Sequence, residues 1–147
     1  MATVQPAPEP THLWVVGILS LLWNAYGGYD YTMSHTGGLE YFESAGFDAA
    51  VFEWFEAMPS WAIAAWAVGV WVSLLGSVLL LLRSRHAATA FAVSLAGALI
   101  SFGYQFTSDK PASLEGLLPT LMPVVILIAI VAQWYYARRQ AAAGVLR

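Results

Sequence analysis

The chain has 147 residues, a formal net charge of −3, 59% hydrophobic residues and only 10% charged residues. Soluble domains normally carry about 25% charged residues, so this composition excludes an ordinary soluble protein and indicates an integral membrane protein. The negative charge argues against nucleic-acid binding, and the absence of cysteine excludes disulfides, thiolate catalysis and cysteine metal sites.

The chain begins with a proline-rich segment, residues 1–11, which we expect to be a short flexible lead. It has no Lys or Arg before the first apolar run, unlike a cleaved signal peptide, so the first span is expected to stay in the mature protein. Four segments have the roughly 20 apolar residues that a helix needs to cross a bilayer. They cover residues 13–33, 59–82, 87–106 and 118–137, within a transmembrane domain 12–140 that a cytoplasmic tail, 141–147, follows. The predicted fold is all-α, an antiparallel bundle of four transmembrane helices.

Basic residues predict the orientation of these spans. All of them except Lys110 fall on the side that holds both termini and the link between the second and third spans: Arg83, Arg85, Arg138, Arg139 and Arg147. Because positively charged loops stay in the cytoplasm, both termini are predicted to be cytoplasmic.

The first outer loop, residues 34–58, is predicted to contain a short amphipathic helix. Asp48 is a suitable N-cap, and the apolar side chains share one face: Val51, Phe52, Phe55 and Met58. This helix is either an aromatic anchor in the outer interface or a lid over an outward-facing cavity.

Asn24 is the polar side chain nearest the middle of the first span. An amide at that depth needs a partner on another helix, and Ser73 and Ser94 lie at matching depths in the next two spans. These residues are predicted to form a structural polar pin. Gln133 is predicted to lie apart from them, close to the cytoplasmic surface.

Asp30 lies further out in the same span, within a turn of the outer headgroups. The polar residues predicted at its level are Tyr26, Tyr29, Tyr31, Tyr104, Gln105 and Thr120. An ionisable residue inside a span is a functional-site hypothesis, so this cluster, without Tyr29, is the predicted ligand site. The alternative is a hydrogen-bonded pin between helices. No Lys or Arg lies in any span to neutralise Asp30, which leaves a cationic ligand or a protonated carboxyl to do so.

Rows of small residues at four-residue spacing mark the second and third spans. Gly69, Ser73 and Ser77 form one row; Ala88, Ala92 and Ala96, then Gly97 and Ser101, form the other. Such rows let helix backbones approach closely, so they predict a tight hairpin of these two spans or contacts within an oligomer.

Motifs for catalysis are missing from the sequence. The glycines at positions 27 and 28 do not follow a strand, as a phosphate-binding loop would, and the three histidines lack metal-ligand spacing. No set of nucleophile and base is visible. The chain is therefore predicted not to be an enzyme, and no cofactor or metal is expected.

Two stretches, LLWNAYGGYDY and MPSWAIAAWAVGVWVSLLGSVLLLLRSR, with the alanine-rich span after them, resemble a family of small four-span bacterial membrane proteins. Most members of that family are labelled hypothetical proteins, and some carry the automated label "sugar transporter". The resemblance is clearest at Trp23, Asn24, Gly27, Asp30, Tyr31, Pro59, Trp61, Trp66, Gly69, Trp71, Gly76 and Arg83. It implies a four-helix fold in a bacterial inner membrane, although nothing in these residues singles out a sugar.

Two functions follow from these expectations. The first is a small-solute transporter or permeation subunit, oligomeric, with the site at Asp30 facing outward. The second is a non-catalytic accessory or scaffolding subunit that docks its apolar helices against a larger membrane complex. In both, the lipid bilayer surrounds the chain.

Overall fold

The computed structural model describes residues 8–147, and this part of the chain is helical without any strand. The predicted flexible lead therefore falls largely outside the described residues. The elements are α1 (Thr11–Thr36), α2 (Gly38–Ser44), α3 (Ala49–Glu56), α4 (Ser60–Leu81), α5 (His86–Thr107), the 3-10 helix η1 (Ala112–Leu114) and α6 (Leu117–Ala142).

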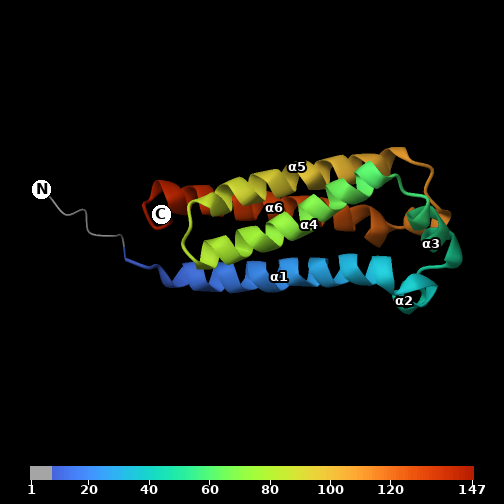
Figure 1. The fold of residues 1–147 in the computed structure, drawn as a ribbon, viewed down its shortest axis with the longest axis horizontal. Helices are drawn as coiled ribbons and strands as arrows, with labels where there is room; N and C mark the ends of the chain where they lie inside the picture. The colour runs from blue at the N-terminus through green and yellow to red at the C-terminus, as the bar shows by residue number, and fades with distance from the viewer. Residues whose placement is uncertain (1–7) are drawn as a thin grey trace, which may run out of the picture.

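The four long helices α1, α4, α5 and α6 lie side by side along the length of the molecule (Figure 1). α2 and α3 cover one end, here called the loop end; the start of α1 and the end of α6 lie at the other, the terminal end. α1 packs on α4, α4 on α5 and α5 on α6, whereas α1 and α6 make few close backbone contacts over their described lengths. The seam between α1 and α6 is thus the loosely packed one.

Three of the long helices, α4, α5 and α6, are long and apolar enough to cross a membrane. α1 is long enough, with 26 residues, but falls outside this set. Asn24, Gly27, Gly28 and Asp30 interrupt the apolar run in its second half. A helical membrane protein is therefore supported, and the fourth span stays a prediction.

α4 and α5 form the closest helix pair, as predicted, but the contact runs through Gly97 and Ser94 and not through the alanine row, in which Ala92 and Ala96 are exposed. A Cβ added at Gly97 would lie 2.7 Å from the carbonyl oxygen of Ala65 and 2.8 Å from the backbone nitrogen of Gly69. The Ser94 hydroxyl donates to the Gly69 carbonyl over 2.6 Å. Because Gly97 and Gly69 have no side chain, the two helix backbones come into contact, and the buried Ser94–Gly69 hydrogen bond joins them.

The segment between α1 and α4 contains two short helices where the sequence predicts one. Asp48 caps α3 as predicted, because its carboxylate accepts a hydrogen bond from the Val51 backbone N–H over 3.1 Å. The apolar face of α3 packs against Phe42 of α2 and Ala62 of α4. The predicted amphipathic helix therefore folds against the long helices, and α2 was not predicted.

The terminal end is closed by the residues after α6. The Arg147 backbone N–H donates to the Arg83 carbonyl over 2.7 Å, and the Arg85 N–H donates to the Arg147 carbonyl over 2.9 Å. Leu146 is buried in an apolar cluster with Leu80 and Phe91. The predicted tail is therefore a packed part of the structure.

Candidate functional site

A cavity of about 470 Å³ lies among α1, α4, α5 and α6, with residues of the α2–α3 segment contributing to its lining at the loop end. This volume falls within the roughly 300–1,000 Å³ that ligand pockets occupy. Its walls are mainly apolar and aromatic, and they include Trp23, Phe47, Trp66, Phe102, Met122 and Ile126. The cavity has the size and the lining of a small-molecule site.

The cavity is partly open. Two of its lining residues, Tyr26 of α1 and Met122 of α6, are 67% and 50% exposed. These residues belong to the two helices of the loose seam, which indicates that the opening lies between α1 and α6.

Asn24 forms the deep polar end of the cavity. Its side-chain amide, 5% exposed, donates to the Gln133 Oε1 over 2.7 Å and to the Ser77 hydroxyl over 2.8 Å. A longer contact of 3.3 Å reaches the Ser73 carbonyl. These hydrogen bonds join α1 to α4 and α6 on the side of the cavity that faces the terminal end. Few backbone contacts join α1 and α6 themselves.

The partners of Asn24 differ in part from the prediction. Ser73 contributes its backbone carbonyl, whereas the Ser94 hydroxyl donates to the Gly69 carbonyl of α4 and not to Asn24. Gln133, predicted to lie apart near the cytoplasmic surface, is instead 8% exposed and bonded to Asn24. Burying two amides without a partner is costly, so their mutual hydrogen bond accounts for this arrangement.

Asp30 lines the cavity nearer the loop end, where it is half-buried. Its Oδ1 accepts a hydrogen bond of 2.6 Å from the Tyr41 hydroxyl of α2. Burial raises the pKa of the Tyr41 phenol above its ordinary value, and the hydrogen bond to Asp30 and the charge of that carboxylate raise this pKa further. Tyr41 thus stays a hydrogen-bond donor and fixes α2 to α1.

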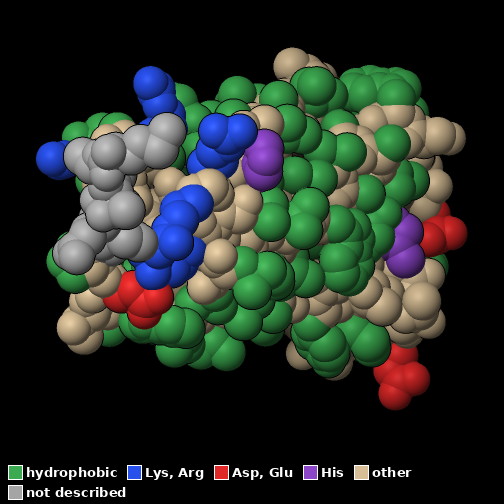
Figure 2. All heavy atoms as spheres, turned by 60° about the vertical axis from the view of Figure 1, so that its left-hand side comes forward, with side chains coloured by type: hydrophobic (Ala, Val, Ile, Leu, Met, Phe, Trp, Pro, Cys, Tyr) green, Lys and Arg blue, Asp and Glu red, His purple; other side chains and the backbone are tan. Residues whose placement is uncertain are grey.

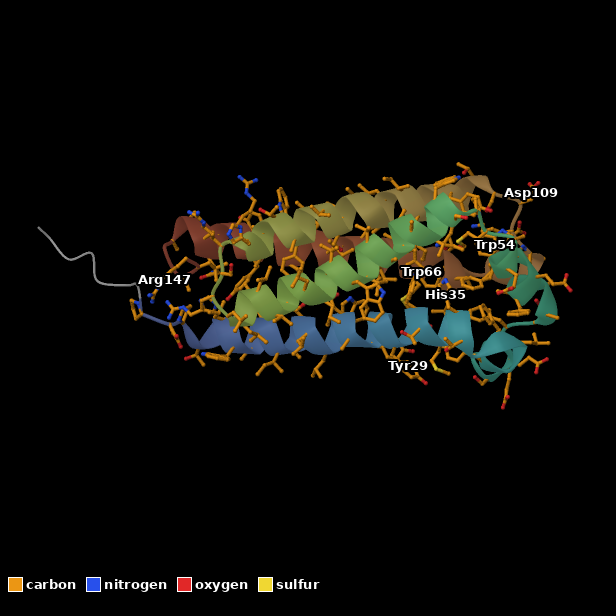
Figure 3. All side chains as sticks on the ribbon, viewed as in Figure 1. Tyr29, His35, Trp54, Trp66, Asp109 and Arg147 are labelled. Carbon is orange, nitrogen blue, oxygen red and sulfur yellow. The ribbon has the colours of Figure 1, made fainter. Side chains whose placement is uncertain are left out.

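Of the residues predicted to gather around Asp30, only Tyr26 lines the cavity with it. Tyr31 turns toward α4, with its ring 4.9 Å from that of Trp66 and 4.3 Å from that of His35; Figure 3 shows His35 and Trp66 close together between α1 and α4. Successive residues of a helix point about 100° apart, so Tyr31 faces α4 while Tyr29, which is 55% exposed, points away from the bundle.

The remaining predicted site residues also lie elsewhere. Tyr104 packs its ring against Trp54 and Trp61, at centroid distances of 6.3 and 5.5 Å. Thr120 is exposed, and Gln105 is half-buried without contributing to the lining. Depth along a span was the signal for all three, and depth does not tell which face of a helix a side chain occupies.

Ser101 of α5 is a lining residue that the prediction missed. It is 1% exposed, and among residues 8–147 its hydroxyl has no hydrogen-bond partner. A buried polar atom without a partner is rare in proteins and calls for an explanation. Its only signal in the sequence is a serine in a row of small residues.

The cavity therefore offers one carboxylate, one amide and the hydroxyls of Tyr26, Tyr41, Ser73 and Ser101 within aromatic walls. Within the described part of the chain, no cluster of His, Asp and Glu could hold a metal ion. This chemistry suits binding. The chain matches no protein-family model, no curated protein and no solved structure, so its function has to be inferred from the cavity.

Proposed function

We propose that the chain is a small-solute transporter or permeation subunit of the bacterial inner membrane, with the cavity among α1, α4, α5 and α6 as its solute site. The observation that carries this proposal is the position of Asp30, a half-buried carboxylate that lines a cavity of about 470 Å³ with mainly apolar walls. Ionisable residues inside membrane helices commonly mark solute pathways.

In this proposal α1 is the fourth span, and both termini are cytoplasmic. The side chains that α1 exposes include Leu19 and Leu22, which suit lipid, whereas Asn24 is buried against the other helices. Most of the Lys and Arg side chains visible in Figure 2 gather at the terminal end, with an apolar belt between the two ends. The positive-inside rule then puts the loop end, nearer to which Asp30 lies in the cavity, outside.

A solute can pass through the bundle only if the hydrogen-bonded layer between the cavity and the terminal end opens. The Asn24–Gln133 and Asn24–Ser77 hydrogen bonds close the route toward the terminal end. Hydrogen bonds between membrane helices contribute only about 0.5–2 kcal/mol each, so a bound solute could compensate for their loss. The loose seam between α1 and α6 is where this movement costs the least packing.

The test uses proteoliposomes and a variant that fills the cavity. Gly27 lines the cavity, and a Cβ added there meets nothing within 4 Å, so Gly27→Leu blocks the cavity without disturbing helix packing. Gly103→Leu, at an equally open glycine of α5 outside the cavity, is the matched control.

We expect the wild type and Gly103→Leu to pass at least one solute of a cationic, neutral and anionic panel faster than protein-free vesicles. Gly27→Leu should return that rate to the vesicle background. Background rates for the wild type across the whole panel would overturn the proposal.

A second candidate function, an accessory subunit of a larger complex, is favoured by α6. This helix exposes large apolar side chains along its length, among them Leu117, Leu118, Val125 and Ile128. They could face either lipid or a docked membrane partner. Extraction in mild detergent followed by mass measurement should then give an assembly larger than one chain, whereas a lone chain would refute this role.

A further inference from the structure

We infer that the solute of this site is an organic monocation with an apolar body, such as a substituted ammonium ion. This inference deepens the proposed function, because it rests on the same cavity and names the class of ligand that the cavity selects. Charge, aromatic lining and volume each support it.

The one charged group that the site can present is a carboxylate. Among the described residues that line the cavity, Asp30 alone is an Asp, Glu, Lys or Arg, and no histidine lines it. Tyr41 donates a neutral hydrogen bond to the carboxylate and so leaves its charge uncompensated. In surroundings of low dielectric constant a cation near Asp30 is strongly attracted, and an anion is repelled.

The walls of the site are suited to a cation with an apolar surface. Six aromatic side chains line the cavity: Trp23, Tyr26, Tyr41, Phe47, Trp66 and Phe102. The faces of aromatic rings attract cations, and sets of such rings recognise quaternary ammonium groups. A carboxylate together with aromatic rings therefore selects a positive head group that carries alkyl or aryl substituents.

The volume of the site excludes a bare metal ion as the natural occupant. A cavity of about 470 Å³ holds a molecule of many atoms, and the residues that line it provide a single carboxylate. The Ser101 hydroxyl, buried and without a partner in the described chain, offers one further polar contact.

The test measures binding of three water-soluble aromatic probes to the purified full-length protein in nanodiscs by calorimetry. The probes are benzyltrimethylammonium, the neutral N,N-dimethylbenzamide and the anionic benzenesulfonate. We expect the cation to bind at least about tenfold more tightly than the neutral probe, and the anion not to bind. In Asp30→Asn, which keeps the shape and can still accept the Tyr41 hydrogen bond, the cation should lose this preference.

A second variant keeps the test decisive if Asp30→Asn folds poorly. Phe102→Leu removes one ring from the wall and should weaken cation binding by about threefold or more while neutral binding stays unchanged. Equal binding of the cationic and neutral probes, unaffected by either change, would overturn the cation assignment and leave a solute site in place. Absence of binding by all three probes would also overturn it; the flux panel with Gly27→Leu then decides separately whether the proposed function stands.

Discussion

Replacing Gly97 by alanine tests the close approach of α4 and α5, on which the walls of the cavity depend. The added Cβ would lie 2.7 Å from the Ala65 carbonyl oxygen and 2.8 Å from the Gly69 nitrogen. Both are backbone atoms, so neither can turn aside as a side chain would. The helices must move apart, which also stretches the 2.6 Å hydrogen bond from Ser94 to Gly69.

The magnitude follows from comparison with Gly103→Ala on the same helix, where an added Cβ meets nothing within 4 Å. Alanine favours a helix over glycine by about 1 kcal/mol at either position, so the difference between the two variants isolates the steric cost. Overpacking of this kind costs about 1–3 kcal/mol. We therefore expect Gly97→Ala to be less stable than Gly103→Ala by that amount.

The assay is reversible unfolding in mixed detergent micelles, followed by circular dichroism. Equal unfolding free energies for the two variants would show that α4 and α5 do not approach each other at Gly97. A Gly97→Ala variant more stable than the wild type would refute the reasoning more strongly, because helix propensity alone would then decide the outcome.

Three further predictions concern the deep end, the loop end and the terminal end of the molecule. Gln133→Leu leaves the Asn24 amide one partner short, so unfolding in mixed micelles should show a loss of about 1–3 kcal/mol; unchanged stability would contradict this. Because the pKa of Tyr41 is raised in the folded protein, the folded chain holds a proton that the unfolded chain loses above about pH 10. The free energy of unfolding should therefore fall as the pH rises past that value, and it should fall less in Tyr41→Phe. The same dependence of the melting temperature on pH in the two proteins would argue against this. Leu146→Asp buries a charge and should lower the melting temperature, whereas Ala143→Asp, at an exposed position, should not; equal shifts would mean that the C-terminal residues are not packed.

The four long helices could be predicted from this sequence because each of them coincides with a long apolar run. The close pair of α4 and α5 was also predicted from small residues at four-residue spacing, but the alanine row named the wrong face of α5, since Ala92 and Ala96 are exposed and Gly97 makes the contact. The cap at Asp48 followed from its place before an amphipathic segment. α2 was missed because its seven residues, Gly38–Ser44, are too few to show a helical period.

The site was harder to predict than the fold. Depth along a span correctly singled out Asn24 and Asp30 as polar groups facing other helices, but their partners Gln133 and Tyr41 depend on how the helices rotate about their axes. Rotation is decided by packing between helices distant in sequence. Tyr31 illustrates the error, because it follows Asp30 directly yet packs against Trp66 of α4.

The chain contains no cysteine, so a single introduced thiol can report directly on access to the cavity. Gly27→Cys places it in the cavity, and Leu99→Cys places it on the exposed face of α5, at a similar distance from the loop end. A membrane-impermeant thiosulfonate reagent is added to vesicles of known orientation. We predict that Gly27→Cys reacts from the outer side and that Leu99→Cys, facing lipid, does not. A Gly27→Cys thiol that stays unreactive, or reacts only from the cytoplasmic side, would contradict a cavity that solutes reach from the outer side.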